Sequence, residues 1–213
     1  MARRHGLWTL VAFLLVASAT SLTAQTLDKG RLDVSWFDPE AVFKEVDEID
    51  YLWVAGDFDL EGRSLHFKPW PEPQFAPSSK PDEKDQRLAK MITAAMQDAL
   101  KDAFAKAYGD RLQASTEKGD IIVEGRVVDC STGSTAAKML VGFGAGSGNT
   151  TIDVRFVEAA TGKVLAGFHH RVVSGTTWST TDSKFFNWLD DAVEEMAKKG
   201  LPKLYARGKK VEK

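Results

Sequence analysis

Alternating apolar and polar positions predict that a β-hairpin lies at the centre of this chain. Between residues 151 and 172 the pattern has a period of two, interrupted by a turn at residues 159–162. Gly162 can adopt the positive φ that such a turn favours. The apolar face consists of Ile152, Val154, Phe156, Val164, Ala166, Phe168, His170 and Val172, and the other face begins with Thr151, Asp153 and Arg155. We therefore expect a hairpin with one buried face.

Two stretches with a helical period predict the elements that cover this buried face. Residues 82–108 carry apolar side chains at spacings of three and four, with Ser78 or Ser79 as a candidate cap and Gly109 as the end. Residues 183–199 repeat the pattern. Their inward positions are Phe185, Phe186, Leu189, Ala192, Val193 and Met196.

Shorter patterns predict the rest of the sheet. Residues 51–58 and 120–130 have strand alternation, and short strands are expected around Leu65 and Leu112. Further short elements are a strand at 34–37, a helical turn or two starting at Asp38-Pro39-Glu40, and a proline-rich connection at 60–81 that wraps the surface. The expected fold is α+β, with a mixed, largely antiparallel sheet of about four to five strands and two helices packed on one face.

The first 24 residues have the features of a secretory signal. Arg3 and Arg4 give a positive start, residues 7–16 are apolar, and small residues offer cleavage after Ala19 or Ala24. A membrane anchor is the alternative, but spanning needs about 20 apolar residues. We expect a periplasmic protein without a lipid-attachment cysteine beside the cleavage site. Its parts would be a cleaved signal at 1–24, an N-terminal extension at 25–50, one α+β domain at 51–206 and a basic tail at 207–213.

Charge and cysteine content narrow the classes of partner. The formal net charge is -2, so the chain lacks the basic balance typical of proteins that bind nucleic acid. Charges of both signs flank the apolar stripe of residues 82–108, which argues against a lipid-binding helix, so we expect membrane contact to be peripheral at most. Cys130, the only cysteine, has no partner for an intrachain disulfide and no basic cluster beside it, so an inert thiol is expected.

A glycine run precedes the hairpin, with glycines at positions 142, 144, 146 and 148. A phosphate-binding loop would need a lysine and a following helix, and here a strand follows. Two explanations stay open, which are close packing of the backbone on a neighbouring element and a contact loop for a partner. The candidate contact residues are Gly142, Phe143, Gly144 and Gly146, together with the aromatic residues Trp70 and Trp178.

The chain contains no motif for catalysis, metal binding or a cofactor that we can assign. Neighbouring residues on a strand point to opposite faces, so His169 and His170 cannot readily bind one ion together. Serine, histidine and acidic residues are present, but the G-x-S-x-G nucleophile motif is not. We therefore assign no catalytic, metal or cofactor residue and expect His170 to be half-buried with its polar groups satisfied.

The order of these elements resembles an uncharacterised bacterial envelope family, a domain of unknown function often made as lipoproteins. The resemblance covers residues 51–205 and is most specific at 120–128 (DIIVEGRVV), 142–147 (GFGAGS) and 160–165 (ATGKVL). The family is similar in layout to the N-terminal domain of TolB and to the curli secretion lipoprotein, which implies a sheet with helices on one side. The missing lipid-attachment cysteine departs from the family pattern. The resemblance implies no catalytic residues.

The leading hypothesis is a non-enzymatic envelope-associated protein, a binding or assembly module with an envelope protein as its partner. One alternative is an envelope hydrolase with an unconventional site, which a shielded cluster of Asp57, His66 or His170 would favour. The other is a binder of a small ligand or glycan that uses Trp70, Trp178 and the glycine run. An exposed aromatic patch without an acid–histidine cluster would favour binding.

The signal pattern leads to a test in the native host. Intact-mass analysis is expected to give a mature protein that begins near Gln25, because small residues precede that position. A purified protein that retains residues 1–24 would contradict this expectation.

Overall fold

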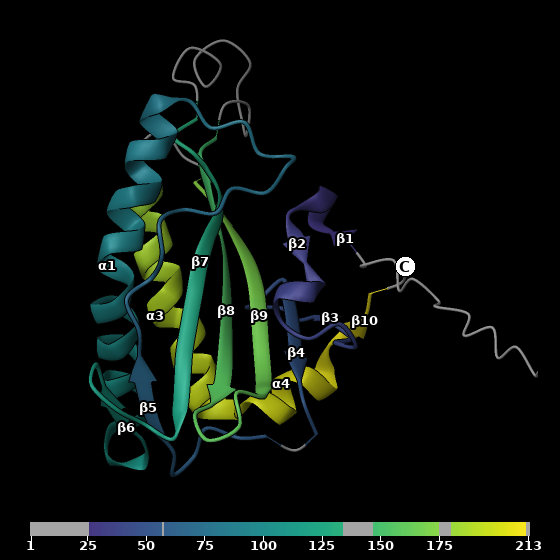
Figure 1. Cartoon of the computed structure of the whole chain (residues 1–213), viewed down its shortest axis with the longest axis vertical. Coiled ribbons are helices and arrows are strands. Elements are labelled where there is room, and N and C mark those ends of the chain that lie inside the picture. The colour runs from purple at the N-terminus through teal and green to yellow at the C-terminus, as the bar shows by residue number, and fades with distance from the viewer. Residues whose placement is uncertain (1–25, 57, 134–146, 175–179, 212–213) are drawn as a thin grey trace, which may run out of the picture.

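Three long strands form the centre of the molecule (Figure 1). The computed structural model describes residues 26–56, 58–133, 147–174 and 180–211. In it β7 (Ile121–Ser131), β8 (Asn149–Glu158) and β9 (Val164–Val173) lie side by side and antiparallel. The alternation predicted for the hairpin is confirmed, because the β8–β9 register pairs Ile152 with His170 and Val154 with Phe168.

The described sheet has eight strands, more than the four to five expected. Its order is β10-β3-β4-β9-β8-β7-β5-β6, and only β5 pairs in parallel, with β6 and β7. The short strands β4 (Tyr51–Val54), β5 (Ser64–Phe67) and β6 (Gln113–Ser115) correspond to the strands expected at 51–58 and around Leu65 and Leu112. The added strands β3 (Lys44–Glu45) and β10 (Lys209–Lys210) are too short to give a clear period in the sequence. A separate ribbon pairs β1 (Thr26–Leu27) with β2 (Leu32–Asp33).

Three α-helices lie in the described part of the chain. They are α1 (Glu83–Tyr108), α3 (Thr181–Lys199) and the short α4 (Leu201–Arg207). The first two confirm the predicted helices and cover one face of the sheet (Figure 1). The cap of α1 is Asp82, whose carboxylate accepts the N–H groups of Lys84 and Asp85, and neither Ser78 nor Ser79 fills this role. Ile92, Leu100, Phe104, Phe156, Phe168 and Phe185 are fully buried in this layer.

The second face of the hairpin is buried as well, which corrects the expectation of a single buried face. Residues 26–43, here called the N-terminal strap, lie across it. Leu32, Val34, Phe37, Ala41 and Phe43 of the strap form a small core with Trp53 of β4. Thr151 and Asp153, on the polar face, are consequently 0% exposed. Gly167 allows this contact, because a Cβ there would lie 2.3 Å from Cδ1 of Phe37.

A β-bulge in β7 changes which side chains face the strap. The register pairs Val127 with Ile152 and then Asp129 with Thr151, so one extra residue lies between them. Without the bulge Asp129 would point to the helices, because side chains on a strand alternate. With it, Asp129 points to the strap and Cys130 joins the core beneath the helices. The Cys130 thiol is buried, and burial raises its pKa to about 12.

Two predictions for the strap were wrong. Residues 34–37, expected as a strand, form the 3-10 turn η2 (Val34–Trp36), because the side chain of Asp33 accepts the Ser35 N–H and starts a turn. The expected helix at residues 38–46 does not form. There the Asp38 carboxylate accepts the Glu40 N–H, and the chain continues into β3.

The proline-rich connection follows the edge of β7 beyond β5. Its backbone donates from Lys68, Gln74 and Ala76 to carbonyls of β7 at distances of 3.2, 2.9 and 2.8 Å. Trp70 is buried over Gly125, where a Cβ would lie 2.1 Å from the indole ring. This segment therefore covers the strand edge without forming a regular strand.

The packing of α1 predicts contrasting effects for two neighbouring positions. Leu100→Ala is expected to lower the free energy of unfolding by about 2–5 kcal/mol, because Leu100 is 1% exposed and its loss leaves a cavity. Lys101→Ala is expected to cost well under about 1 kcal/mol, since its ion pairs with Asp98 and Asp102 lie at the surface. Urea denaturation of both variants measures the difference. Equal midpoints would show that the helix face is assigned wrongly.

Candidate functional site

Strand β9 carries two adjacent histidines that face opposite sides of the sheet. His169 points to the strap, and His170 points to α3. The predicted placement of the two side chains on opposite faces of the strand is thus confirmed. Each histidine has its own set of partners, and the two surroundings differ in what they can do chemically.

His169 lies in a closed network of charged groups beneath the strap. Its Nδ1 is 2.6 Å from Asp153 Oδ1, and its Nε2 is 3.2 Å from Asp28 Oδ2. Burial by itself lowers the pKa of His169, but the hydrogen bonds to the two carboxylates outweigh it and raise the pKa above its usual value. Arg126 Nε lies 2.8 Å from the second oxygen of Asp153, so each oxygen of this buried carboxylate has its own partner.

The same face holds two further clamps on the strap. Arg31 of the strap donates to Asp129 at 2.7 Å, and Asp129 also accepts the hydroxyl of Ser79. The Trp36 ring contacts two guanidinium groups, those of Arg126 and Arg155, at 4.5 and 4.4 Å from its centroid. These contacts attach the strap to β7 and β8 at points outside its small apolar core.

The backbone of the strap is strained where it approaches His169. Asp28 and Lys29 have φ values of 46° and 55°, in the left-handed region that residues other than glycine rarely adopt. Such strain persists only where surrounding contacts hold it. Here the Asp28–His169 hydrogen bond and the ribbon of β1 and β2 on either side supply those contacts.

His170 lies on the other side of β9, at the floor of a groove. Its ring stacks on Trp188 of α3 with centroids 4.0 Å apart, and its Nδ1 accepts the Asp50 N–H at 3.1 Å. Burial, and secondarily the neighbouring His169, lower the pKa of His170 to about 3. The ring is therefore neutral near pH 7, and its single proton lies on Nε2 because Nδ1 accepts a hydrogen bond.

The groove itself has a volume of about 500 Å³ and runs between the end of β9 and the outer side of α3. Lys184, Asn187 and Asp191 form its α3 wall, and Val173 stands at its β9 rim with 45% of its surface exposed. The indole N–H of Trp188 donates to the Glu48 carbonyl at 2.9 Å, which fixes the ring in place. The groove therefore combines a rigid aromatic floor with polar walls.

The sequence-derived contact residues are placed only in part. Gly142, Phe143, Gly144, Gly146 and Trp178 lie outside the described residues, so both explanations of the glycine run stay predictions. Trp70 is 8% exposed, and its ring is covered by the core and by Gly125. An aromatic contact through Trp70 would require this segment to leave β7.

The cluster proposed for an enzyme is not assembled among the described residues. Asp57 lies outside them, and His66 is on β5, which β7 and β8 separate from β9 and His170. In the described ranges no group of three or more His, Cys, Asp or Glu residues could hold a metal ion. The network of Asp28, Asp153 and His169 was missed, although Asp153 and His169 stand at polar positions of the predicted hairpin.

Comparison with known proteins identifies the family. The model of a domain of unknown function, DUF4410, matches residues 54–177, which is more than half of the 213-residue chain. The chain therefore belongs to this family, in agreement with the resemblance to an uncharacterised envelope family. A search of curated proteins finds no match.

Solved structures include two with a similar layout. PelC from Paraburkholderia phytofirmans, a dodecamer, has a TM-score of 0.41 and 8% identity, over 73% of this chain and 95% of PelC. A Xanthomonas campestris protein of the DUF330 family has a TM-score of 0.36 and 12% identity, over 70% of this chain and 87% of its own. Likenesses at this level carry no argument about binding or assembly. That argument has to come from the residues of this chain.

The His169 network leads to a pH-dependent prediction. Because the pKa of His169 is raised in the folded state, the stabilisation is complete below the unfolded value of about 6.5 and is lost as the pH rises through the folded pKa. His169→Gln is expected to cost about 1–3 kcal/mol, since Asp153 keeps Arg126 but loses one of its two hydrogen-bonded partners, and Asp28 loses its bond to β9. Urea denaturation between about pH 6 and 9 measures both effects.

His66→Gln provides the matched control, because His66 is on β5 and has no ion pair among the described residues. It is expected to keep the decline of stability with rising pH. If His169→Gln also keeps that decline unchanged, another group is responsible for it and His169 does not clamp the strap.

Proposed function

We propose that this chain is a non-enzymatic binding module of the bacterial envelope, periplasmic once its signal is removed, that binds an extended protein segment along β9. The observation that carries the proposal is an open strand edge beside the groove. Strand β4 pairs with β9 from Ala166 to His169 only, and residues 171–173 have no neighbouring strand on that side in the described structure.

The register shows which backbone groups the edge presents. Ser174 N–H bonds to Gly148 O, so even-numbered residues of β9 bond to β8. Ala55 N–H bonds to Leu165 O, so odd-numbered residues face the β4 side. The Arg171 carbonyl and both backbone groups of Val173 therefore point to the open edge, where no described residue bonds them. An extended backbone is the occupant whose donors and acceptors match this row.

The groove gives the added segment a place for its side chains. Because side chains of an added strand alternate, every second one would point toward the Trp188–His170 stack. His170 is 9% exposed, and its Nε2–H has no hydrogen-bond acceptor among the described residues. A segment that carries an acceptor group at that position satisfies this proton, whereas a purely apolar segment does not.

The chemistry of His169 supports a binding role over hydrolysis. A general base needs a ring nitrogen that can accept a proton from substrate or water. Both nitrogens of His169 are bonded to carboxylates, and the ring is 0% exposed. The acid–histidine cluster in the described structure therefore serves to hold the strap. No described helix is both long and apolar enough to cross a membrane.

The open edge predicts that a proline at Val173 blocks binding. Val173→Pro removes an N–H that points away from β8, so the β8–β9 ladder is expected to survive while strand addition fails. Val173→Thr keeps the N–H and the β-branched shape and serves as the control. The measurement is in-cell crosslinking in the native host, with a photoreactive residue placed at Asn187 on the groove wall.

A crosslinked protein is expected from position 187 in the wild-type and Val173→Thr backgrounds, and is expected to be lost in Val173→Pro. The same photoreactive residue at Met91, which is exposed on α1, reports non-specific neighbours. Equal crosslinking from both positions, or adducts from position 187 that persist in Val173→Pro, would refute strand addition at β9.

A further inference from the structure

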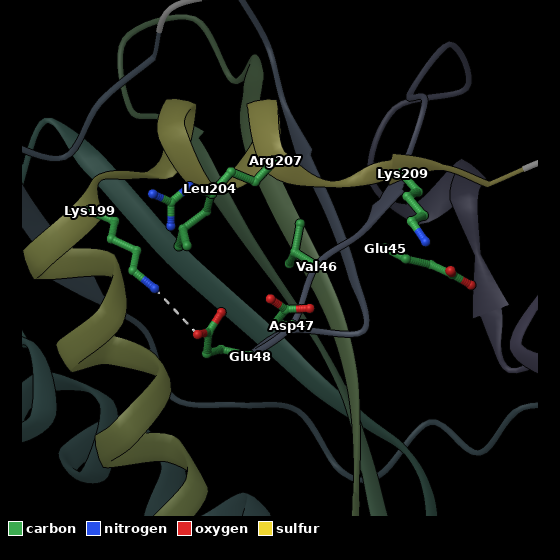
Figure 2. A pocket seen from close by; sticks show the side chains of 8 residues that line it. All are labelled: Glu45, Val46, Asp47, Glu48, Lys199, Leu204, Arg207 and Lys209. Atoms are coloured by element: carbon green, nitrogen blue, oxygen red, sulfur yellow. Dashed lines mark hydrogen bonds and ion pairs between the residues drawn. The ribbon is translucent and has the colours of Figure 1, made fainter.

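The outward face of α1 carries charges that are sorted along the helix rather than mixed. At the sheet edge, where β3 and β10 adjoin the ends of α3 and α4, acidic and basic side chains are interspersed, and Lys199 lies 3.4 Å from Glu48 (Figure 2). On α1 the two signs are separated instead. Between Lys84 and Asp102, the exposed side chains opposite the buried Leu100 are Lys84, Arg87, Met91, Ala94, Ala95, Asp98 and Asp102, here called the outer band.

The order of charges in the outer band has no explanation within one helix. Its basic residues, Lys84 and Arg87, lie toward the N-terminus of α1, and its acidic residues, Asp98 and Asp102, lie toward the C-terminus. The helix dipole favours the reverse order. Asp98 and Asp102 also share one lysine, Lys101, at 3.2 Å each, so the acidic end of the band keeps an excess of negative charge.

The middle of the outer band is apolar. Met91 has 50% of its surface exposed, the highest value among the large apolar side chains of the described residues. Ala94 and Ala95, beside it, are exposed and small. A protruding side chain next to small ones allows two helices to interdigitate, because the ridge of one fits the groove of the other.

We propose that the outer band binds a second copy of this chain, with the two α1 helices antiparallel around a two-fold axis near position 93. Lys84 and Asp102 are equally far from that position along the helix, and Arg87 and Asp98 nearly so. Each basic side chain of one copy therefore faces an acidic side chain of the other. A parallel pair of helices would instead bring like charges together.

The helical period lets both kinds of ion pair form at once. Lys84 and Asp102 are about five turns apart and lie along one side of the outer band, whereas Arg87 and Asp98 are about three turns apart and lie along the other side. In a two-fold antiparallel pair, each side of the band faces the same side of the other copy. The ion pair of Arg87 with Glu83, at 3.8 Å, lies at the surface and contributes little, so Arg87 can turn to the other copy.

The apolar middle fixes the register of the two helices. With the axis near position 93, Met91 of each copy lies on Ala95 of the other. Sliding one helix by a turn in one direction leaves Arg87 facing Ala95, and sliding it in the other sets Lys84 against Lys106. The chosen register is therefore the one that matches both the charges and the apolar surface.

Charge reversal tests the proposal by sedimentation velocity. Between about 5 and 500 µM the wild type is expected to shift from the mass of one chain toward that of two, because one helix pair makes a small and weak interface. Lys84→Glu and Asp102→Lys are each expected to weaken this association about tenfold, since each replaces two ion pairs by two like-charged contacts. The double variant is expected to restore it. Positions 84 and 102 lie roughly 27 Å apart in one helix, so the restoration can arise only between copies.

Cysteine variants test the register of the same interface. Ala94→Cys, close to the axis, is expected to give a disulfide-linked dimer on mild oxidation, whereas Ala105→Cys, which is also exposed but far from the axis, is not. The native Cys130 is buried and does not compete. The adduct expected from a photoreactive residue at Met91 is a second copy of this chain, which its mass distinguishes from a partner bound at β9.

Lys163→Glu, in the turn between β8 and β9, makes the same change of net charge away from α1 and should associate as the wild type does. A wild-type chain that stays monomeric up to about 500 µM would overturn the proposal. So would a double variant that associates no better than Lys84→Glu or Asp102→Lys alone. Neither result bears on strand addition at β9.

Discussion

The structure depends on covering both faces of one hairpin. Strands β8 and β9 bury their apolar side chains beneath α1 and α3, which is the ordinary result of alternation. Their other face carries Asp153 and His169, and the strap covers it so completely that both are 0% exposed. A buried carboxylate is costly unless it is paired and hydrogen-bonded. The bonds of Asp153 to His169 and Arg126 meet that requirement. The bond between His169 and Asp28 connects this buried network to the strap.

The sequence predicts those parts of the fold in which a helical or alternating pattern continues over many residues. In the helices of residues 82–108 and 183–199 the apolar stripe repeats over several turns. In the hairpin the alternation repeats over several pairs of residues. The strap has no such pattern, because its apolar residues are fixed by contacts with residues distant in the sequence, such as Trp53 and Gly167. Two-residue strands such as β3 and β10 are defined by their neighbours alone, and local propensity carries too little information to find them.

The candidate site, like the fold, could be predicted from the sequence only in part. Sequence alternation was enough to place His169 and His170 on opposite faces, because that follows from strand geometry alone. It could not supply their partners, since Asp28 is 141 positions from His169 and Asp50 is 120 positions from His170. The bulge at Asp129 could not be foreseen either, since its effect is to reverse the alternation that the prediction assumed.

Asp50 determines how much of β9 is open. It ends the pairing of β4, and its carboxylate accepts the Arg171 N–H at 2.8 Å while its own N–H bonds His170. Burial, the largest influence, raises the pKa of this carboxyl. A long unpaired edge invites aggregation, and a charged side chain that caps one of its donors shortens it. Among the described residues, what stays open is the stretch beside Val173, long enough for a few backbone hydrogen bonds and bordered by the Trp188 groove. Selectivity would then come from the groove, because so short an edge binds any extended chain only weakly.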